Sequence, residues 1–210
     1  MRVITANERT GTKQKILEAS IELFSLHGYS AVSVREITKL VGIKESALYN
    51  HFKTKDEILE TIYSIFQFEI SSKALPPIDR LEELLQDNNV ESFLLQGFHR
   101  FKQSVDEANT VKIWRILNIE QFRDVRARKL IVEDVYQKTI DFLEAAFTIM
   151  ISKRMMKQGE PRLLATQYQY PLFAFMTEYL LLSCDQIDTK PLEHRVEQHI
   201  RYFIAAVKVN

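Results

Sequence analysis

Eight polar residues between positions 33 and 55 are of the types that bind nucleic acid. Three have side chains that can read base edges, because a carboxylate accepts from cytosine N4 and an amide pairs with adenine: Glu45, Ser46 and Asn50. The other five can donate hydrogen bonds to phosphate oxygens: Ser33, Lys44, Tyr49, His51 and Lys55. The Tyr49 ring could also contact a thymine methyl group. These groups can act together only if the chain brings them to one surface.

The twenty residues that start at Ser33 predict a helix-turn-helix that would do so. Ser33 and Glu36 form a capping box, so a helix should begin there. Apolar residues recur at helical spacing up to Leu40, and Gly42 stands where a sharp turn needs positive φ. A second short helix is expected from about Lys44, with its polar residues turned outward. Such a helix fits the major groove of B-DNA, which is about 12 Å wide.

The flanking segments agree with this interpretation. Upstream, an apolar helical stripe ends at Gly28, a suitable residue just beyond a helix C-terminus. Downstream, Thr54 and Glu57 form a second capping box, so another helix should begin there with its first amides directed at a phosphate. Residues 1–12 are expected to form a frayed terminus, with a basic arm for the minor groove as the alternative.

Residues 13–59 closely resemble the DNA-binding domain of TetR/AcrR-type transcriptional regulators. The resemblance covers about a quarter of the chain and rests on these residues: Ile16, Ala19, Leu23, Phe24, Gly28, Ser33 to Ile37, Val41, Gly42, Ile43, Leu48, Tyr49, His51, Phe52, Lys53 and Lys55. It implies a homodimer on a pseudo-palindromic double-stranded DNA operator, and a repressor that a small molecule releases. In that family, the positions of Ser33, Tyr49, His51 and Lys55 usually contact phosphate or backbone.

One departure from the family pattern lies at Lys44 and Glu45, where members usually have Ser followed by Lys, Arg or Pro. Lysine cannot cap a helix, and the loss of a good cap costs about 1 kcal/mol. Glu45 complements the helix dipole but would repel phosphates. Two interpretations stay open: Glu45 reads a cytosine, or it is a solvent-exposed residue at the start of the helix.

The rest of the chain is predicted to be all-α, so two domains are expected: residues 1–55 for the helix-turn-helix domain and 56–210 for a larger helical ligand-binding and dimerisation domain. The expected helices after the one that starts near position 55 are 78–85, one around Phe93 to Phe101, 111–122, 127–157, 163–184 with a kink near Pro171, and 192–207. The apolar faces of the last two are expected to form a four-helix dimer interface, the final helix contributing Val196, Ile200, Phe203, Ile204 and Val207. The alternative is that these two helices close a monomeric core.

Large apolar side chains on the central helices are candidates for a small-molecule pocket, with an apolar or amphipathic ligand: Phe98, Phe101, Trp114, Phe142 and Met176. His99, Asn118 and Gln121 could anchor its polar groups. At helical spacing such residues also fit an ordinary core. A DNA-binding dimer controlled by a protein partner, without a small molecule, is therefore the alternative, as is an activator.

Composition excludes several other classes. The 28 basic and 28 acidic residues balance, but residues 1–55 hold nine basic and five acidic residues and the remainder carries the compensating negative charge. This asymmetry suits a DNA-reading domain on a neutral-to-acidic body. The single Cys184 is expected to be a buried thiol, and no signal segment or membrane span is evident, so the cytoplasm is expected. No phosphate-binding glycine loop or metal motif occurs, so neither an enzyme nor a cofactor is expected.

Overall fold

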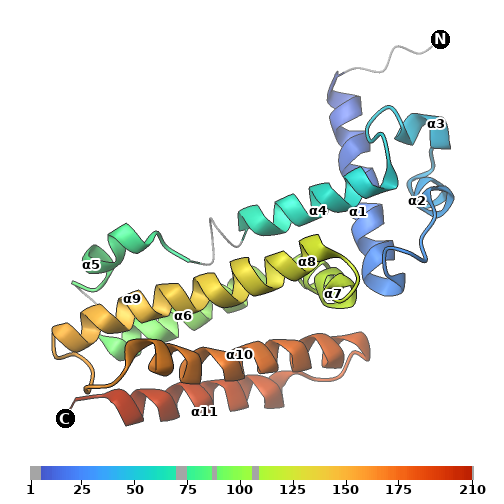
Figure 1. Cartoon of the computed structure of the whole chain (residues 1–210). Helices are drawn as coiled ribbons and strands as arrows, with labels where there is room; N and C mark the ends of the chain where they lie inside the picture. The colour runs from blue at the N-terminus through green and yellow to red at the C-terminus, as the bar shows by residue number, and fades with distance from the viewer. Residues whose placement is uncertain (1–5, 70–74, 87–88, 106–108, 210) are drawn as a thin grey trace. The chain divides into compact units, whose positions relative to one another are not determined.

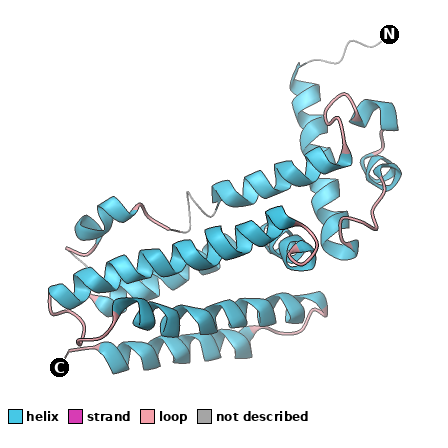
Figure 2. Cartoon of the chain, in the orientation of Figure 1, coloured by secondary structure: helices cyan, strands magenta, loops and turns pink. Residues whose placement is uncertain are grey.

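The computed structural model describes residues 6–69, 75–86, 89–105 and 109–209, and the regular structure in these ranges is helical (Figures 1 and 2). No β-strand occurs within them, and an isolated bridge pairs Met156 with Lys208. The predicted all-α fold class is confirmed.

The helices pack as two compact units. The first unit comprises Met1–Glu69 and Asp106–Ile131, and the second comprises Ile70–Val105 and Val132–Asn210. The first unit thus adds later helices to the helix-turn-helix. The functional boundary after residue 55 stays a prediction.

In the first unit, α1 (Ala6–His27) contacts α2 (Val34–Val41), α4 (Lys55–Glu69) and α7 (Thr110–Glu120). The short α3 (Glu45–Leu48) packs on α2, and α8 (Val125–Lys129) follows α7. The side chains of Phe24, Ile37, Leu48 and Phe52 are fully buried in this unit. α1 begins at Ala6, so residues 6–12 are helical rather than frayed; residues 1–5 lie outside the described ranges.

The second unit is a bundle of longer helices. It contains the 3-10 turn η2 (Ile78–Arg80), α5 (Leu81–Leu84), α6 (Val90–Val105), α9 (Lys138–Ser152), α10 (Pro161–Cys184) and α11 (Lys190–Val207). α10 packs on α9 and α11, and α11 also packs on α6 (Figure 1). The core includes Phe147, Tyr168 and Phe203.

The predicted single helix over 127–157 differs from the structure in two ways. A π-helical segment, η3 (Leu130–Gln137), separates α8 from α9, and α9 ends at Ser152. Arg154 then adopts a left-handed φ of 57°, which an α-helix does not continue through. The spacing of the apolar residues predicts neither the π-helical segment nor the end of α9 at Ser152.

The apolar stripe of α11 is already used within the chain. Val196, Ile200, Phe203, Ile204 and Val207 are all buried in the core of the second unit, so the prediction that they face a second subunit was wrong. They pack against α6 and α10 instead. The expectation for the thiol was also wrong, since Cys184 is exposed at the end of α10.

Candidate nucleic-acid interface

The first helix of the motif is fixed by its predicted cap. Ser33 Oγ accepts from the Glu36 amide at 3.2 Å, and Glu36 Oε2 accepts from both the amide and the hydroxyl of Ser33 at 2.7 Å. These hydrogen bonds lower the pKa of the Glu36 carboxyl. The exposed Ser33 therefore holds the start of α2 in place at the surface.

The turn after α2 sets the direction of α3. Gly42 has φ 77° and ψ 33°, and its amide donates to the Thr38 carbonyl at 3.0 Å. Lys44 occupies the N-cap of α3 without a side-chain hydrogen bond, as predicted for a lysine. α3 is consequently short, and Leu48, which is fully buried, anchors it.

The outward surface of α3 and the following turn carries the predicted DNA-binding residues. The side chains of Lys44, Glu45, Ser46, Tyr49 and Asn50 are exposed. Within the described ranges they form no hydrogen bond or ion pair, although all of them have polar groups. His51 is half-buried. Five groups with free hydrogen-bonding capacity thus share one surface.

The start of α4 presents free backbone donors. Thr54 Oγ1 accepts from the Glu57 amide at 3.1 Å, and Glu57 Oε2 accepts from the Lys53 amide at 2.6 Å rather than from that of Thr54. The amides of Lys55 and Asp56 have no acceptor among the described residues. Such a helix N-terminus favours an anion.

Lys55 is tied to the loop between α1 and α2. Its Nζ donates to the carbonyls of Tyr29 at 2.9 Å and Val32 at 2.7 Å, and it lies 4.1 Å from the centroid of the Tyr29 ring. Partial burial lowers the pKa of the Lys55 ammonium. Two of its three donors are therefore used within the protein.

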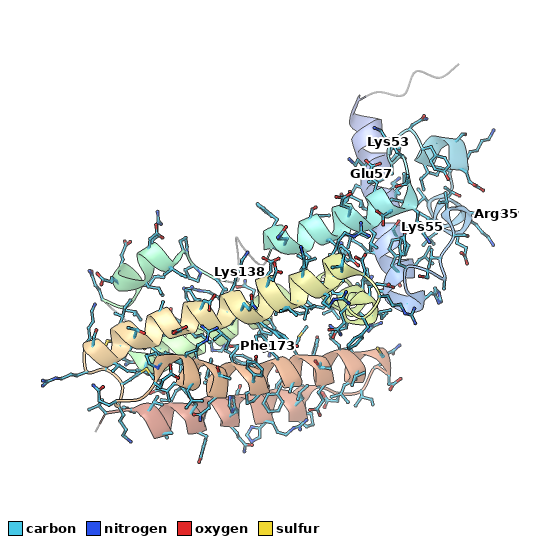
Figure 3. All side chains as sticks on the ribbon, in the orientation of Figure 1. Arg35, Lys53, Lys55, Glu57, Lys138 and Phe173 are labelled. Atoms are coloured by element: carbon cyan, nitrogen blue, oxygen red, sulfur yellow. The ribbon has the colours of Figure 1, made fainter. Side chains whose placement is uncertain are left out.

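Three exposed cations near this surface were not among the predicted DNA-binding residues. Arg35 and Lys39 lie four residues apart on α2, and Lys53 precedes α4. Figure 3 labels Arg35 and Lys53. The three side chains make no ion pair with the described residues. Residues four apart share one face of a helix, so the predicted α2 could have identified the Arg35 and Lys39 pair.

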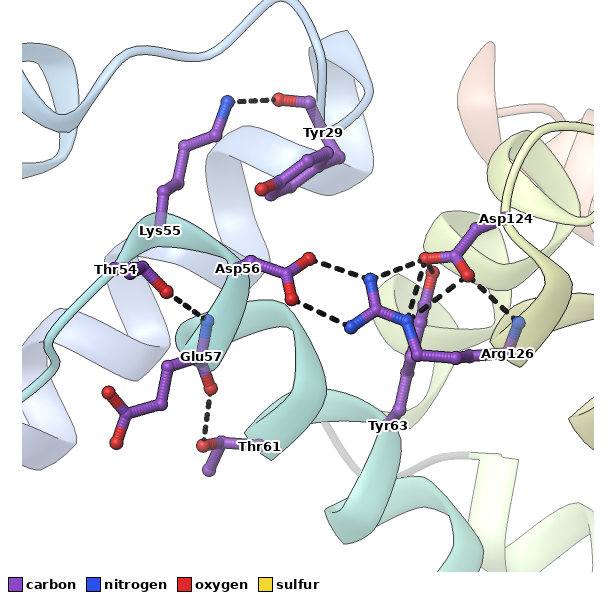
Figure 4. Close-up of polar contacts among 9 residues, drawn as sticks. All are labelled: Tyr29, Thr54, Lys55, Asp56, Glu57, Thr61, Tyr63, Asp124 and Arg126. Carbon is purple, nitrogen blue, oxygen red and sulfur yellow. Dashed lines mark hydrogen bonds and ion pairs between the residues drawn. The ribbon is translucent and has the colours of Figure 1, made fainter.

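Polar contacts join α4 to the start of α8, as Figure 4 shows, and a further contact joins the loop after α1 to α7. Arg126 donates to both carboxylate oxygens of Asp56, at 2.9 Å from Nη1 and 2.7 Å from Nη2, and also to Asp124. The buried Glu120 accepts from the Tyr29 amide at 2.8 Å. Burial and the Asp124 charge raise the pKa of Tyr63. Burial alone would raise the pKa of the Asp124 carboxyl. The hydrogen bonds that it accepts from Arg126 outweigh the effect of burial, so the pKa of Asp124 is lowered.

The predicted ligand residues do not all belong to one unit. Trp114 lies in the first unit, buried edge-to-face against Phe66 with ring centroids 4.9 Å apart. Phe142 and Met176 are buried in the second unit, where Phe98 and Phe101 are half-buried. The amides of Asn118 and Gln121 donate within α7, and His99 is exposed. The pocket stays a prediction.

The described ranges contain neither a membrane-spanning helix nor a cluster of metal-binding side chains. No helix there is long and apolar enough to cross a membrane. Nor do the described residues include a group of three or more His, Cys, Asp or Glu side chains that could hold a metal ion.

Similar proteins share both the motif and the fold. Residues 16–62 match the family model described as bacterial regulatory proteins of the tetR family. The regulator AcrR of Shigella flexneri is 33% identical over 89 residues, which are 39% of this chain and 41% of AcrR. The negative regulator IcaR of the Staphylococcus epidermidis biofilm operon icaADBC is 29% identical over 90 residues, 42% of each protein. The match thus spans about two fifths of each relative.

Solved structures extend the likeness to nearly the whole chain. A TetR-family regulator from Mesorhizobium loti has a TM-score of 0.65 at 19% identity, covering 96% of this chain and 98% of its own. The SmeT–triclosan complex has a TM-score of 0.66 at 17% identity, covering 95% and 93%. These likenesses show the fold.

The motif, its cap at Ser33 and the family match define a helix-turn-helix domain of the kind found in bacterial transcriptional regulators. Residues 16–62 match the tetR family of bacterial regulatory proteins, and the chain as a whole has the fold of TetR-family regulators. Its named relatives are regulators and not enzymes, in agreement with the prediction.

Proposed function

We propose that this protein is a homodimeric repressor that binds a pseudo-palindromic operator and is released by a small apolar or amphipathic molecule. One observation carries the DNA-binding part: five polar side chains on α3 and its flanks share an exposed surface, and none is hydrogen-bonded within the described ranges. In a folded protein, such a group of unused donors and acceptors is available to a polar partner.

The roles at the DNA divide by chemistry. Glu45, Ser46 and Asn50 would read base edges, with Asn50 able to pair bidentately with adenine. The exposed Tyr49 and Lys44 would contact phosphates, whereas both donors of Ser33 are used in the cap with Glu36. The free amides at the start of α4 would bind a further phosphate. Arg35, Lys39 and Lys53 would add charge that fixes position without selecting sequence.

The second subunit would bind at an exposed apolar stripe on α10. Leu163, Tyr170, Ala174 and Leu181 project within about 20° of one direction at 3.6 residues per turn. All four are exposed, and Leu181 retains 64% of its accessible surface. Two subunits related by a twofold axis would place their α3 helices in half-sites about 34–36 Å apart.

Operator binding can be tested by selecting duplexes from a random library and measuring affinity by fluorescence anisotropy at a stated salt concentration. We expect a palindromic consensus bound with nanomolar affinity, typical of specific complexes. Tyr49→Ala should lower this affinity at least tenfold while thermal stability is unchanged, because the side chain is exposed. Selection without a consensus, or an unaffected Tyr49→Ala variant, would contradict the proposal.

Ligand release can be tested with triclosan, the compound in the SmeT complex. Trp114 is the single tryptophan and one of the predicted ligand-binding residues, so its fluorescence reports on binding close to its own side chain. We expect triclosan to change that fluorescence and to release the selected duplex over the same concentration range. DNA binding that no small apolar compound alters would favour control by a protein partner.

A further inference from the structure

The first turn of α4 carries two carboxylates at a helix end that favours anions. Asp56 and Glu57 are its second and third residues, and the amides of Lys55 and Asp56 are free. Acidic side chains stabilise a helix N-terminus, but beside a DNA phosphate they repel it. DNA binding here therefore requires that both carboxylates be neutralised or turned away.

Glu57 is occupied within the helix cap. Its carboxylate accepts from the Lys53 amide at 2.6 Å, and its own amide donates to Thr54. The hydrogen bond from the Lys53 amide holds the Glu57 carboxylate against the backbone of the preceding turn.

Asp56 is held by a residue 70 positions later in the chain. Arg126 donates to both of its oxygens, and the same guanidinium donates to Asp124, the N-cap of α8 (Figure 4). The hydrogen bonds that Arg126 donates to Asp56 and Asp124 raise the pKa of its guanidinium further, so its charge is permanent. The guanidinium is therefore both the counter-ion of Asp56 and the link from α4 to α8.

The Arg126–Asp56 pair lies at the surface, where water and salt screen it. The two side chains retain 37% and 51% of their accessible surface. The pair can consequently be removed without unfolding the protein, and its effect on charge near the free amides can be measured separately.

We propose that Arg126 is a positioning residue for DNA binding, which neutralises Asp56 and so keeps a repulsive carboxylate away from the phosphate at the start of α4. The inference rests on the proposed DNA binding.

The contact between Arg126 and Asp56 also provides a route by which a ligand would regulate DNA binding. Arg126 lies in a helical run that continues through residues 125–152, and a ligand that displaces α8 would expose the Asp56 charge to the DNA.

The test is a double-mutant cycle on DNA affinity, using the duplex that the wild-type protein enriches from a random library. Arg126→Met should weaken binding about three- to tenfold, as expected for one uncompensated charge near phosphates. Asp56→Asn should bind at least as tightly as wild type. In the Asp56→Asn background, Arg126→Met should weaken binding less than twofold, because no carboxylate remains to be neutralised.

Each other outcome of the cycle has a definite meaning. An equal loss from Arg126→Met in both backgrounds would overturn the proposal, because Arg126 would then act on DNA independently of Asp56. Weakened binding by Asp56→Asn alone would overturn it in favour of a purely structural clamp. If wild type enriches no duplex, the proposed function fails, and this inference fails with it.

Arg162 offers a matched control in the second unit. It also bridges two carboxylates, to Asp141 at 2.9 Å and Glu144 at 2.5 Å, and is similarly exposed. Arg162→Met should leave DNA affinity unchanged, and a loss equal to that of Arg126→Met would overturn the assignment to α4. All variants should keep the wild-type circular dichroism spectrum.

Discussion

Lys53 and Lys55 are two residues apart, but their ammonium groups have different surroundings. Lys53 is exposed and has no ion-pair partner among the described residues, whereas Lys55 donates to two backbone carbonyls of the loop between α1 and α2. The sequence predicts a phosphate contact for Lys55 and none for Lys53. The structure therefore separates a charge available to phosphate from one that supports the fold.

Substitution by methionine should reveal this difference. Lys55→Met should lower the free energy of unfolding by about 1–2 kcal/mol, because two carbonyls lose charged donors. Lys53→Met should leave it within about 0.5 kcal/mol, as for most exposed sites. Lys53→Met should instead reduce the slope of log DNA affinity against log salt concentration by about one unit. Urea denaturation and anisotropy at several salt concentrations measure both effects; equal destabilisation would contradict the assignment.

The outward side chains at the candidate interface were predictable because they follow from local signals. The Ser33 cap sets the start of α2, Gly42 sets the turn, and helical periodicity then predicts that Glu45 and Asn50 face outward. The partner of Asp56 was not predictable in this way. Arg126 is 70 residues away from Asp56 in the sequence, and no local sequence pattern predicts which surface charges form an ion pair after folding.

At the level of elements, two glycines set the geometry of the turns on either side of α2. Gly28 and Gly42 have φ values of 76° and 77°, in the left-handed region that favours glycine. Their surroundings differ, however. A Cβ at Gly42 would meet nothing within 4 Å, whereas one at Gly28 would lie 3.3 Å from Ile119 Cγ2 and 3.4 Å from Glu120 Oε1.

Alanine at the two positions should therefore differ in cost. Gly42→Ala should lower the free energy of unfolding by about 1 kcal/mol, the cost of positive φ alone. Gly28→Ala should cost more, because the methyl group also crowds the buried carboxylate that accepts from the Tyr29 amide. Denaturant unfolding of both variants checks the order. Gly42→Ala as the more harmful substitution would mean that the contact with α7 can relax.

Element boundaries were predictable where caps mark them and not elsewhere. The helix starts at Val34 and Lys55 follow capping residues that the sequence displays. The π-helical segment from Leu130 to Gln137 has no such marker, because its apolar residues fit an α-helix equally well.

At the level of the whole molecule, packing decides which apolar faces remain available to a partner. The sequence showed α10 and α11 as two apolar helices, but the core of the second unit buries the stripe of α11. Exposed apolar surface remains on α10, along the stripe from Leu163 to Leu181, and at Tyr202 on α11. The proposed dimer interface therefore rests on α10 more than on α11.

A charge on the α10 stripe should separate the subunits. Leu181→Glu would bury a carboxylate in an apolar interface, so sedimentation should give a monomer where wild type gives a dimer. Operator affinity should fall at least tenfold, because one subunit would bind a half-site without the second. Ile78→Glu is the matched control, since Ile78 is an aliphatic side chain of similar exposure on η2. If both variants remain dimeric, the subunits meet at another surface; if wild type is itself a monomer, the homodimer proposal is wrong.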